Sequence, residues 1–147
     1  MEEIQNEPSN PNTPRWQFGR LSLWEAAPDV LRLSLVGVVD GPELQAVFDT
    51  QAAWGAGKAF WYTIVDVSHL ETSTPSSRRV VLDTDPNPNS MAVLFGVSFA
   101  TRMLIELTMR AKRLLMPGKP HQLMMAATEA DAWREVERLR AIRAQNG

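Results

Sequence analysis

The sequence predicts a single α/β domain with a mostly parallel, five-stranded mixed sheet, an N-terminal β-hairpin and four helices. Three observations support this fold class. The chain has 147 residues, the size of one ordinary domain. Apolar residues make up 44% of it, which is enough for a continuous core. After an opening pair of strands, every strand pattern is followed by a helical pattern, as is typical of a parallel sheet covered by helices.

The first fourteen residues differ from the rest of the chain. Residues 1–14 contain three prolines and few apolar side chains, so we expect a disordered tail followed by one domain over 15–147. The tail lacks the apolar segment of a secretory signal, and a cytoplasmic location is therefore expected. The most apolar stretch, 91–107, is interrupted by charged residues and is shorter than the ~20 residues that cross a bilayer. No transmembrane segment is expected.

The opening hairpin and the first helix follow from local patterns. Trp16, Phe18, Leu21 and Leu23 form a first strand candidate, and apolar residues alternate with polar ones over 31–35, which predicts two strands joined by a turn at 27–29. Asp40, followed three residues later by Glu43, is a capping-box arrangement. It predicts the start of a helix that ends at the glycines near 55–57.

Three strand-and-helix pairs follow, and their expected ranges are 60–67 with 75–82, 91–99 with 100–115, and 122–126 with 128–142. The unbroken apolar run of the first pair is typical of a central strand covered on both faces. Pro75 suits the first position of a helix because it has no N–H to leave unpaired. Thr128 is expected to cap the last helix.

No set of residues predicts catalysis or a metal site. Asp66, Ser68 and His69 contain the groups of a hydrolase triad, but neighbouring strand residues point to opposite faces and cannot converge. The other histidine is His121, and the chain has no cysteine, so neither a metal nor a cofactor is expected. The Asp/Asn loop over 83–89 lacks the glycine and the glutamate of a calcium loop. A formal charge of −2 disfavours nucleic acid as a partner.

Two segments resemble the SpoIIAA-like family of STAS domains, which includes anti-sigma-factor antagonists and Sec14-like relatives. Residues 66–70 (DVSHL) look like the family's Asp-x-Ser-x-Leu/Val run at the end of the central strand. Residues 114–118 (LLMPG) are similar to a Met-Pro-Gly turn before the last strand. The resemblance covers about 18–139. It implies the predicted fold and a non-enzymatic, regulatory role.

The resemblance also implies a protein partner. In antagonists of this family a serine at the start of the second helix, preceded by aspartate, is phosphorylated. Thr74 and Pro75 occupy those two positions here, and Pro75 has no hydroxyl. The candidate phospho-acceptors, or contacts of a kinase or an anti-sigma-like regulator, are Thr72, Ser73, Thr74, Ser76, Ser77, Arg78 and Arg79. Alternatively, Thr74 is simply an N-cap.

The long helix predicts a second class of function, because it is apolar on more than one side. Its expected core stripe is Ala100, Met103, Leu104, Leu107, Ala111, Leu114 and Leu115. A second apolar line is either covered by a neighbouring element or free for a dimer partner, another protein or an acyl chain. This line consists of Ile105, Met109 and Met116, with Thr108 and Lys112 among them.

The Sec14-like relatives imply a pocket for a lipid or other apolar small molecule between the sheet and this long helix. Its candidate residues are Leu104, Ile105, Met109 and Met116. A cavity of several hundred Å³ there would favour the small-molecule hypothesis, and a filled core would favour the protein-interaction hypothesis. The protein-interaction module is the leading hypothesis from sequence, and a homodimer is left open.

Overall fold

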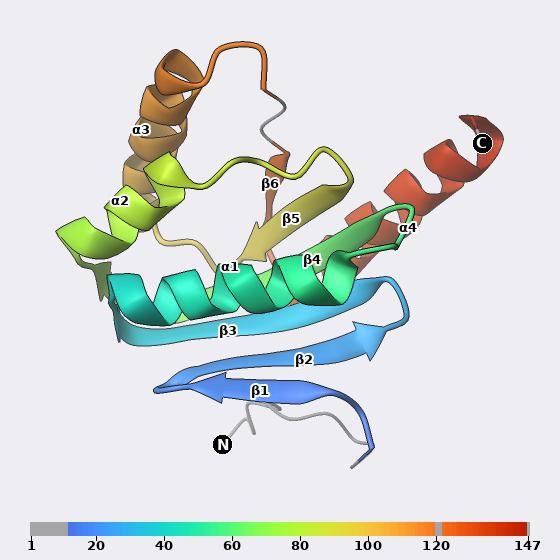
Figure 1. The fold of residues 1–147 in the computed structure, drawn as a ribbon, viewed down its shortest axis with the longest axis horizontal. Helices are drawn as coiled ribbons and strands as arrows, with labels where there is room; N and C mark the ends of the chain where they lie inside the picture. Colours follow the sequence, from blue (N-terminus) through green and yellow to red (C-terminus); the bar gives the residue numbers. More distant parts are fainter. Residues whose placement is uncertain (1–11, 120–121, 147) are drawn as a thin grey trace.

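The computed structural model describes residues 12–119 and 122–146, so the expected tail lies outside the described residues as far as residue 11. The described chain forms one six-stranded sheet and four helices (Figure 1). The strands are β1 (Arg15–Phe18), β2 (Leu21–Ala27), β3 (Val30–Val39), β4 (Trp61–Ser73), β5 (Ser90–Phe95) and β6 (Leu123–Ala126). The helices are α1 (Gly41–Gly55), α2 (Pro75–Asp83), α3 (Phe99–Leu115) and α4 (Glu129–Asn146).

The strands lie in the sheet in the order in which they occur along the chain. β1, β2 and β3 pair antiparallel, whereas β3, β4, β5 and β6 pair parallel. The prediction of a mostly parallel sheet with an N-terminal hairpin is confirmed, and so is the number of helices in the described residues.

The sequence predicted five strands, whereas the described sheet has six. The pattern over 16–23 was expected to form one strand, but a two-residue turn divides it into β1 and β2, with Phe18 paired to Leu21. Gly19 has a φ of +60°, the conformation that favours glycine at the first central position of a tight hairpin turn. The apolar positions change from even numbers (Trp16, Phe18) to odd ones (Leu21, Leu23) across this turn, a break that one continuous strand would not show.

Two other strand boundaries differ from the prediction. β4 continues to Ser73, past the apolar run that ends at Val67. β5 ends at Phe95 instead of continuing to Phe99, because Gly96 turns the chain with a φ of +74°. A Cβ on Gly96 would lie 2.7 Å from the Cβ of Ser68, so the turn passes close against β4.

Three of the described helices, α1, α2 and α4, begin where the sequence predicts. Asp40 caps α1 through a hydrogen bond from the Gly41 N–H, 2.9 Å, and Thr74 caps α2 by accepting from the Ser77 N–H, 3.2 Å. Thr128 likewise accepts from the backbone N–H of Asp131, 3.2 Å, at the start of α4. None of the described helices combines the length and the hydropathy needed to cross a membrane.

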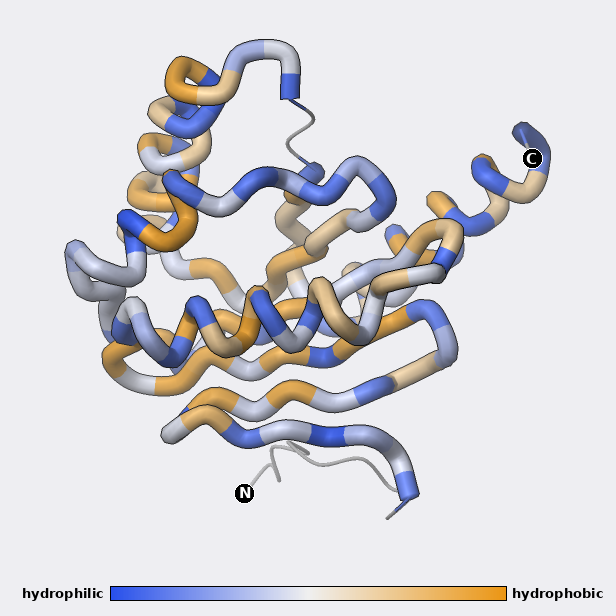
Figure 2. Tube along the Cα trace, viewed as in Figure 1, coloured by the Kyte–Doolittle hydropathy of each residue, from blue (hydrophilic) through white to orange (hydrophobic). Residues whose placement is uncertain are grey.

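The helices form two layers around the sheet. α1, α2 and α3 lie over one face, and α4 packs on the opposite face against β4, β5 and β6 (Figure 1). Successive residues of a strand face opposite layers, so Val65 packs on the side of α1 and Ile64 packs on the side of α4. Hydrophobic residues run along the central strands in Figure 2, as expected of a sheet covered on both faces.

Candidate functional site

A cavity of about 380 Å³ lies between the sheet and the three helices α1, α2 and α3. Small-molecule sites in proteins have volumes of about 300–1,000 Å³, so this cavity is large enough for a small ligand. Its floor is made by apolar residues at alternate positions of the parallel strands. They include Leu33, Val65, Ala92, Leu94 and Leu123.

One face of α3 forms a wall of the cavity. Leu104, Ile105 and Met109, three of the four residues predicted for a pocket, line it. Residues three and four apart share a helix face, which brings these side chains together with Thr108. Met116, the fourth predicted residue, does not line the cavity, because it follows the last helical residue as the C-cap of α3.

The expected core stripe of α3 is wrong for most of its members. Leu114 is 79% exposed, and Met103, Leu107 and Leu115 are exposed as well, whereas Leu104 lines the cavity. Both lines of apolar residues have helical spacing, so hydropathy along the sequence could not show which one faces the sheet. The second line is less apolar because it includes Thr108 and Lys112, and it is the line that faces the cavity.

Lys112 is the charged residue of α3 that lines the cavity. Its side chain is buried, and its Nζ donates a hydrogen bond to the backbone oxygen of Val81, 2.7 Å. Burial lowers the pKa of Lys112, and the charge of Asp85 opposes this shift. Lys112 was not among the residues predicted for a pocket. The signal was its spacing of seven and three residues from Ile105 and Met109.

The start of α2 contains the predicted partner-binding residues. The Asp40 carboxylate accepts hydrogen bonds from the hydroxyls of Ser76, 2.8 Å, and Thr74, 3.0 Å. These bonds, with one from the backbone N–H of Gly41, hold the pKa of Asp40 below its usual value, and the Ser76 bond has the largest effect. Asp40 thus joins the start of α1 to the start of α2.

The predicted hydroxyl residues differ in accessibility. Thr72 and Ser76 are exposed, whereas Ser77 is 1% exposed and its hydroxyl donates to the Thr74 backbone oxygen, 2.9 Å. Arg78 donates to the backbone oxygen of Ser73, 2.7 Å. Arg79 pairs with Asp83 at the surface. Three of these predicted residues, Ser73, Ser77 and Arg78, also line the cavity.

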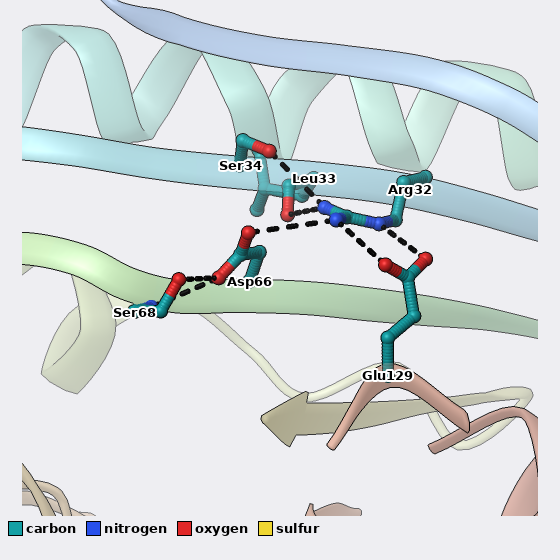
Figure 3. A network of polar contacts seen from close by, with 6 residues as sticks. All are labelled: Arg32, Leu33, Ser34, Asp66, Ser68 and Glu129. Atoms are coloured by element: carbon teal, nitrogen blue, oxygen red, sulfur yellow. Dashed lines mark hydrogen bonds and ion pairs between the residues drawn. The ribbon is translucent and has the colours of Figure 1, made fainter. Parts of the chain in front are cut away.

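Asp66 belongs to a polar network on the opposite face of the sheet (Figure 3). Arg32, which is 4% exposed, contacts Asp66 at 3.5 Å and Glu129 at 3.0 Å. The Asp66 carboxylate also accepts hydrogen bonds from the backbone N–H and the hydroxyl of Ser68. His69 is exposed. The carboxylate therefore compensates a buried arginine, and the three groups of a triad do not form a chain of hydrogen bonds in the described structure.

Within residues 12–119 and 122–146, no group of three or more His, Asp or Glu side chains is placed to hold a metal ion. The second histidine, His121, lies outside the described residues.

Comparison with known proteins identifies the fold. No protein-family model and no curated protein matches the chain. Among solved structures, it is similar to the anti-sigma factor antagonist SpoIIAA in its unphosphorylated form, with a TM-score of 0.52 and 16% identity over 80% of this chain and 97% of that one. The chain is also similar to an uncharacterised protein from Shewanella loihica with a SpoIIAA-like fold, with a TM-score of 0.47 and 12% identity. That match covers 83% of this chain and 90% of the other. The chain has the SpoIIAA-like fold, which confirms the resemblance as one of fold.

Proposed function

We propose that the protein is a non-enzymatic module that binds an apolar small molecule, such as a lipid acyl chain, between the sheet and α3. The observation that carries this proposal is the cavity of about 380 Å³, because a hollow face was the feature expected to distinguish ligand binding from protein interaction alone. An apolar cavity forgoes the packing contacts of a filled core, and a bound apolar molecule would restore them.

The opposite face of the sheet supports this proposal. There Ile64 and Val93 from the sheet and Val136 from α4 are each fully buried. The same strands therefore support close packing where a helix lies directly on them. Toward the C-terminal end of α4 this face also has a hollow, of about 390 Å³ beside Leu139 and Ile142, so the contrast applies to the part of α4 around Ala132 and Val136.

The proposal is tested by titrating the full chain with N-phenyl-1-naphthylamine, an uncharged dye whose fluorescence rises in apolar surroundings. We expect saturable binding at one site. Ala92→Leu adds apolar volume to the cavity floor and should weaken binding roughly tenfold or more. Leu107→Ala is the matched control on the exposed side of α3 and should leave binding unchanged. Absence of saturable binding, or loss of binding in Leu107→Ala alone, would contradict the proposal.

A second candidate function is interaction with a regulatory protein partner at the start of α2. The fold of an anti-sigma factor antagonist supports it, as does the exposure of Thr72 and Ser76 beside Arg78 and Arg79. A phosphate on Ser76 would replace a hydroxyl that donates to Asp40 and would place two anions side by side. Modification would therefore open the junction between α1 and α2.

Mass spectrometry of the protein purified from its own host tests this second candidate. The expected result is one added phosphate on Thr72 or Ser76, and none on the buried Ser77. Ser76→Ala distinguishes the two sites. A protein that carries no phosphate at either exposed hydroxyl under any growth condition would count against a phosphorylation switch.

A further inference from the structure

Lys112 brings a cation into apolar surroundings. The residue is 7% exposed, and it lines the cavity together with Ile105 and Met109. An ammonium group has three donors, and the hydrogen bond to the Val81 oxygen uses one of them. Across the described residues, 12–119 and 122–146, no carboxylate oxygen lies within 4.0 Å of Nζ. A buried charge without a carboxylate partner needs a reason.

The other charged residues that line the cavity are Arg78 and Asp85. Asp85 is exposed to solvent, and one nitrogen of Arg78 donates to the backbone oxygen and the hydroxyl of Ser73. The charged lining is therefore net positive, with one acid against two bases. The most buried charge in it is that of Lys112, at one end of an apolar floor.

A purely structural role explains part of this arrangement. Val81 lies in the last turn of α2, where unpaired backbone carbonyls favour a cation, so Lys112 ties α3 to the end of α2. A surface lysine could do the same while keeping its ammonium in water. The structural role accounts for one donor, and it does not account for the burial.

We propose that the ligand of the cavity is an aliphatic carboxylate, whose apolar chain lies on the floor formed by β3, β4 and β5 and whose carboxylate binds Nζ of Lys112. One buried cation matches one negative charge, and the apolar floor matches the chain. This inference rests on the proposed function and adds the chemical class of the ligand. A carboxylate beside Nζ would also compensate the charge that burial destabilises.

Calorimetric titration of the full chain with decanoate and with decanol tests this proposal, because the two compounds share a chain and differ in the charge of the head group. Wild-type protein should bind decanoate roughly tenfold or more tightly than decanol, as expected of a charge-assisted hydrogen bond in a partly dry site. Lys112→Met should remove that preference and leave decanol binding within about threefold. Arg113→Met is the matched control, since it removes the same charge from an exposed neighbouring position.

The outcomes separate this proposal from the function on which it rests. Equal binding of decanoate and decanol to wild-type protein, or a preference that persists in Lys112→Met, would overturn the assignment to Lys112 while the cavity stood. Failure of both compounds to bind wild-type protein would contradict the proposed function itself. Should Lys112→Met fail to fold, the comparison of the two compounds on wild-type protein and on Arg113→Met decides the question.

Discussion

The two faces of the sheet are built from the same strands, but they are filled differently. On one face α4 packs directly on β4, β5 and β6, and its residues Ala132 and Val136 are fully buried. On the other face α3 packs mainly beside α2, and its inward residues Leu104, Ile105 and Met109 are only half-buried over a cavity. Strand alternation supplies two apolar faces equally, so the covering helices decide which face is filled.

The residues of the two helices explain the difference. Ala132 presents a small side chain to the sheet, which allows α4 to approach closely. At corresponding inward positions α3 carries Thr108 and Lys112, and Lys112 bonds to the end of α2. Part of α3 is thus held by its neighbour helix and not by the sheet.

The largest expected effect is on the filled face, at the buried ion pair. Arg32→Met should lower the free energy of unfolding by about 3–5 kcal/mol, because it leaves the buried carboxylate of Asp66 without its cation. Urea denaturation measures this loss. Arg79→Met breaks a pair in which both side chains are mostly exposed, and should cost less than about 1 kcal/mol. Similar losses in both variants would mean that the Arg32 network is not effectively buried.

A matched pair of isoleucines compares the packing of the two faces. Ile64→Ala on the filled face should cost about 2–5 kcal/mol, because the variant creates a cavity in a close-packed layer. Ile105→Ala enlarges a cavity that already exists and should cost less, about 1 kcal/mol. The same denaturation experiment measures both. Equal costs would argue that the two faces are filled alike.

The pH dependence of stability should show a smaller effect, which arises from Lys112 on the hollow face. The pKa of Lys112 is lowered in the folded protein from its ordinary value of 10.5, so the unfolded chain binds more protons in the pH window below that value. The stability of wild-type protein relative to Lys112→Met should therefore rise as the pH approaches 10.5. Denaturation of both proteins across this range measures the difference. A difference that stays constant or falls would show that the ammonium is not destabilised by burial.

The smallest effect is expected on the outer side of α3. Leu107 is exposed, so Leu107→Ala should change the stability by no more than about 0.5 kcal/mol. Leu104→Ala, one turn away on the inner side, should cost more because Leu104 contacts the lining of the cavity. Thermal denaturation of the two variants measures both changes in stability. The reverse order would mean that Leu107, and not Leu104, lies on the side of α3 that faces the sheet.

Local chemistry made much of the fold predictable. Asp40, Thr74 and Thr128 occupy the ends of helices as their hydrogen-bonding side chains require, and the alternation of strands with helices predicted the parallel pairing. The turn at Gly19 was missed, although the sequence carries a signal for it: the apolar positions change from even (Trp16, Phe18) to odd (Leu21, Leu23) across the turn.

The site was less predictable than the fold. Three of the four predicted pocket residues line the cavity, because α3 was correctly placed beside the sheet. Its rotation was wrong, since two apolar lines compete on one helix and the choice depends on contacts with α2 that are distant in sequence. Lys112 was missed for the same reason, because its partner Val81 lies 31 residues away.

The most direct test of the difference between the two faces is a matched pair of variants, each of which replaces an alanine with leucine. Their stability is measured by denaturation, and their ligand binding is measured with N-phenyl-1-naphthylamine. Ala132→Leu overpacks the filled face and should lower the stability by about 1–3 kcal/mol while leaving dye binding intact. Ala92→Leu adds the same volume to the hollow face and should leave the stability unchanged or higher while weakening dye binding roughly tenfold or more. Equal destabilisation by both substitutions, with dye binding retained in Ala92→Leu, would contradict the account.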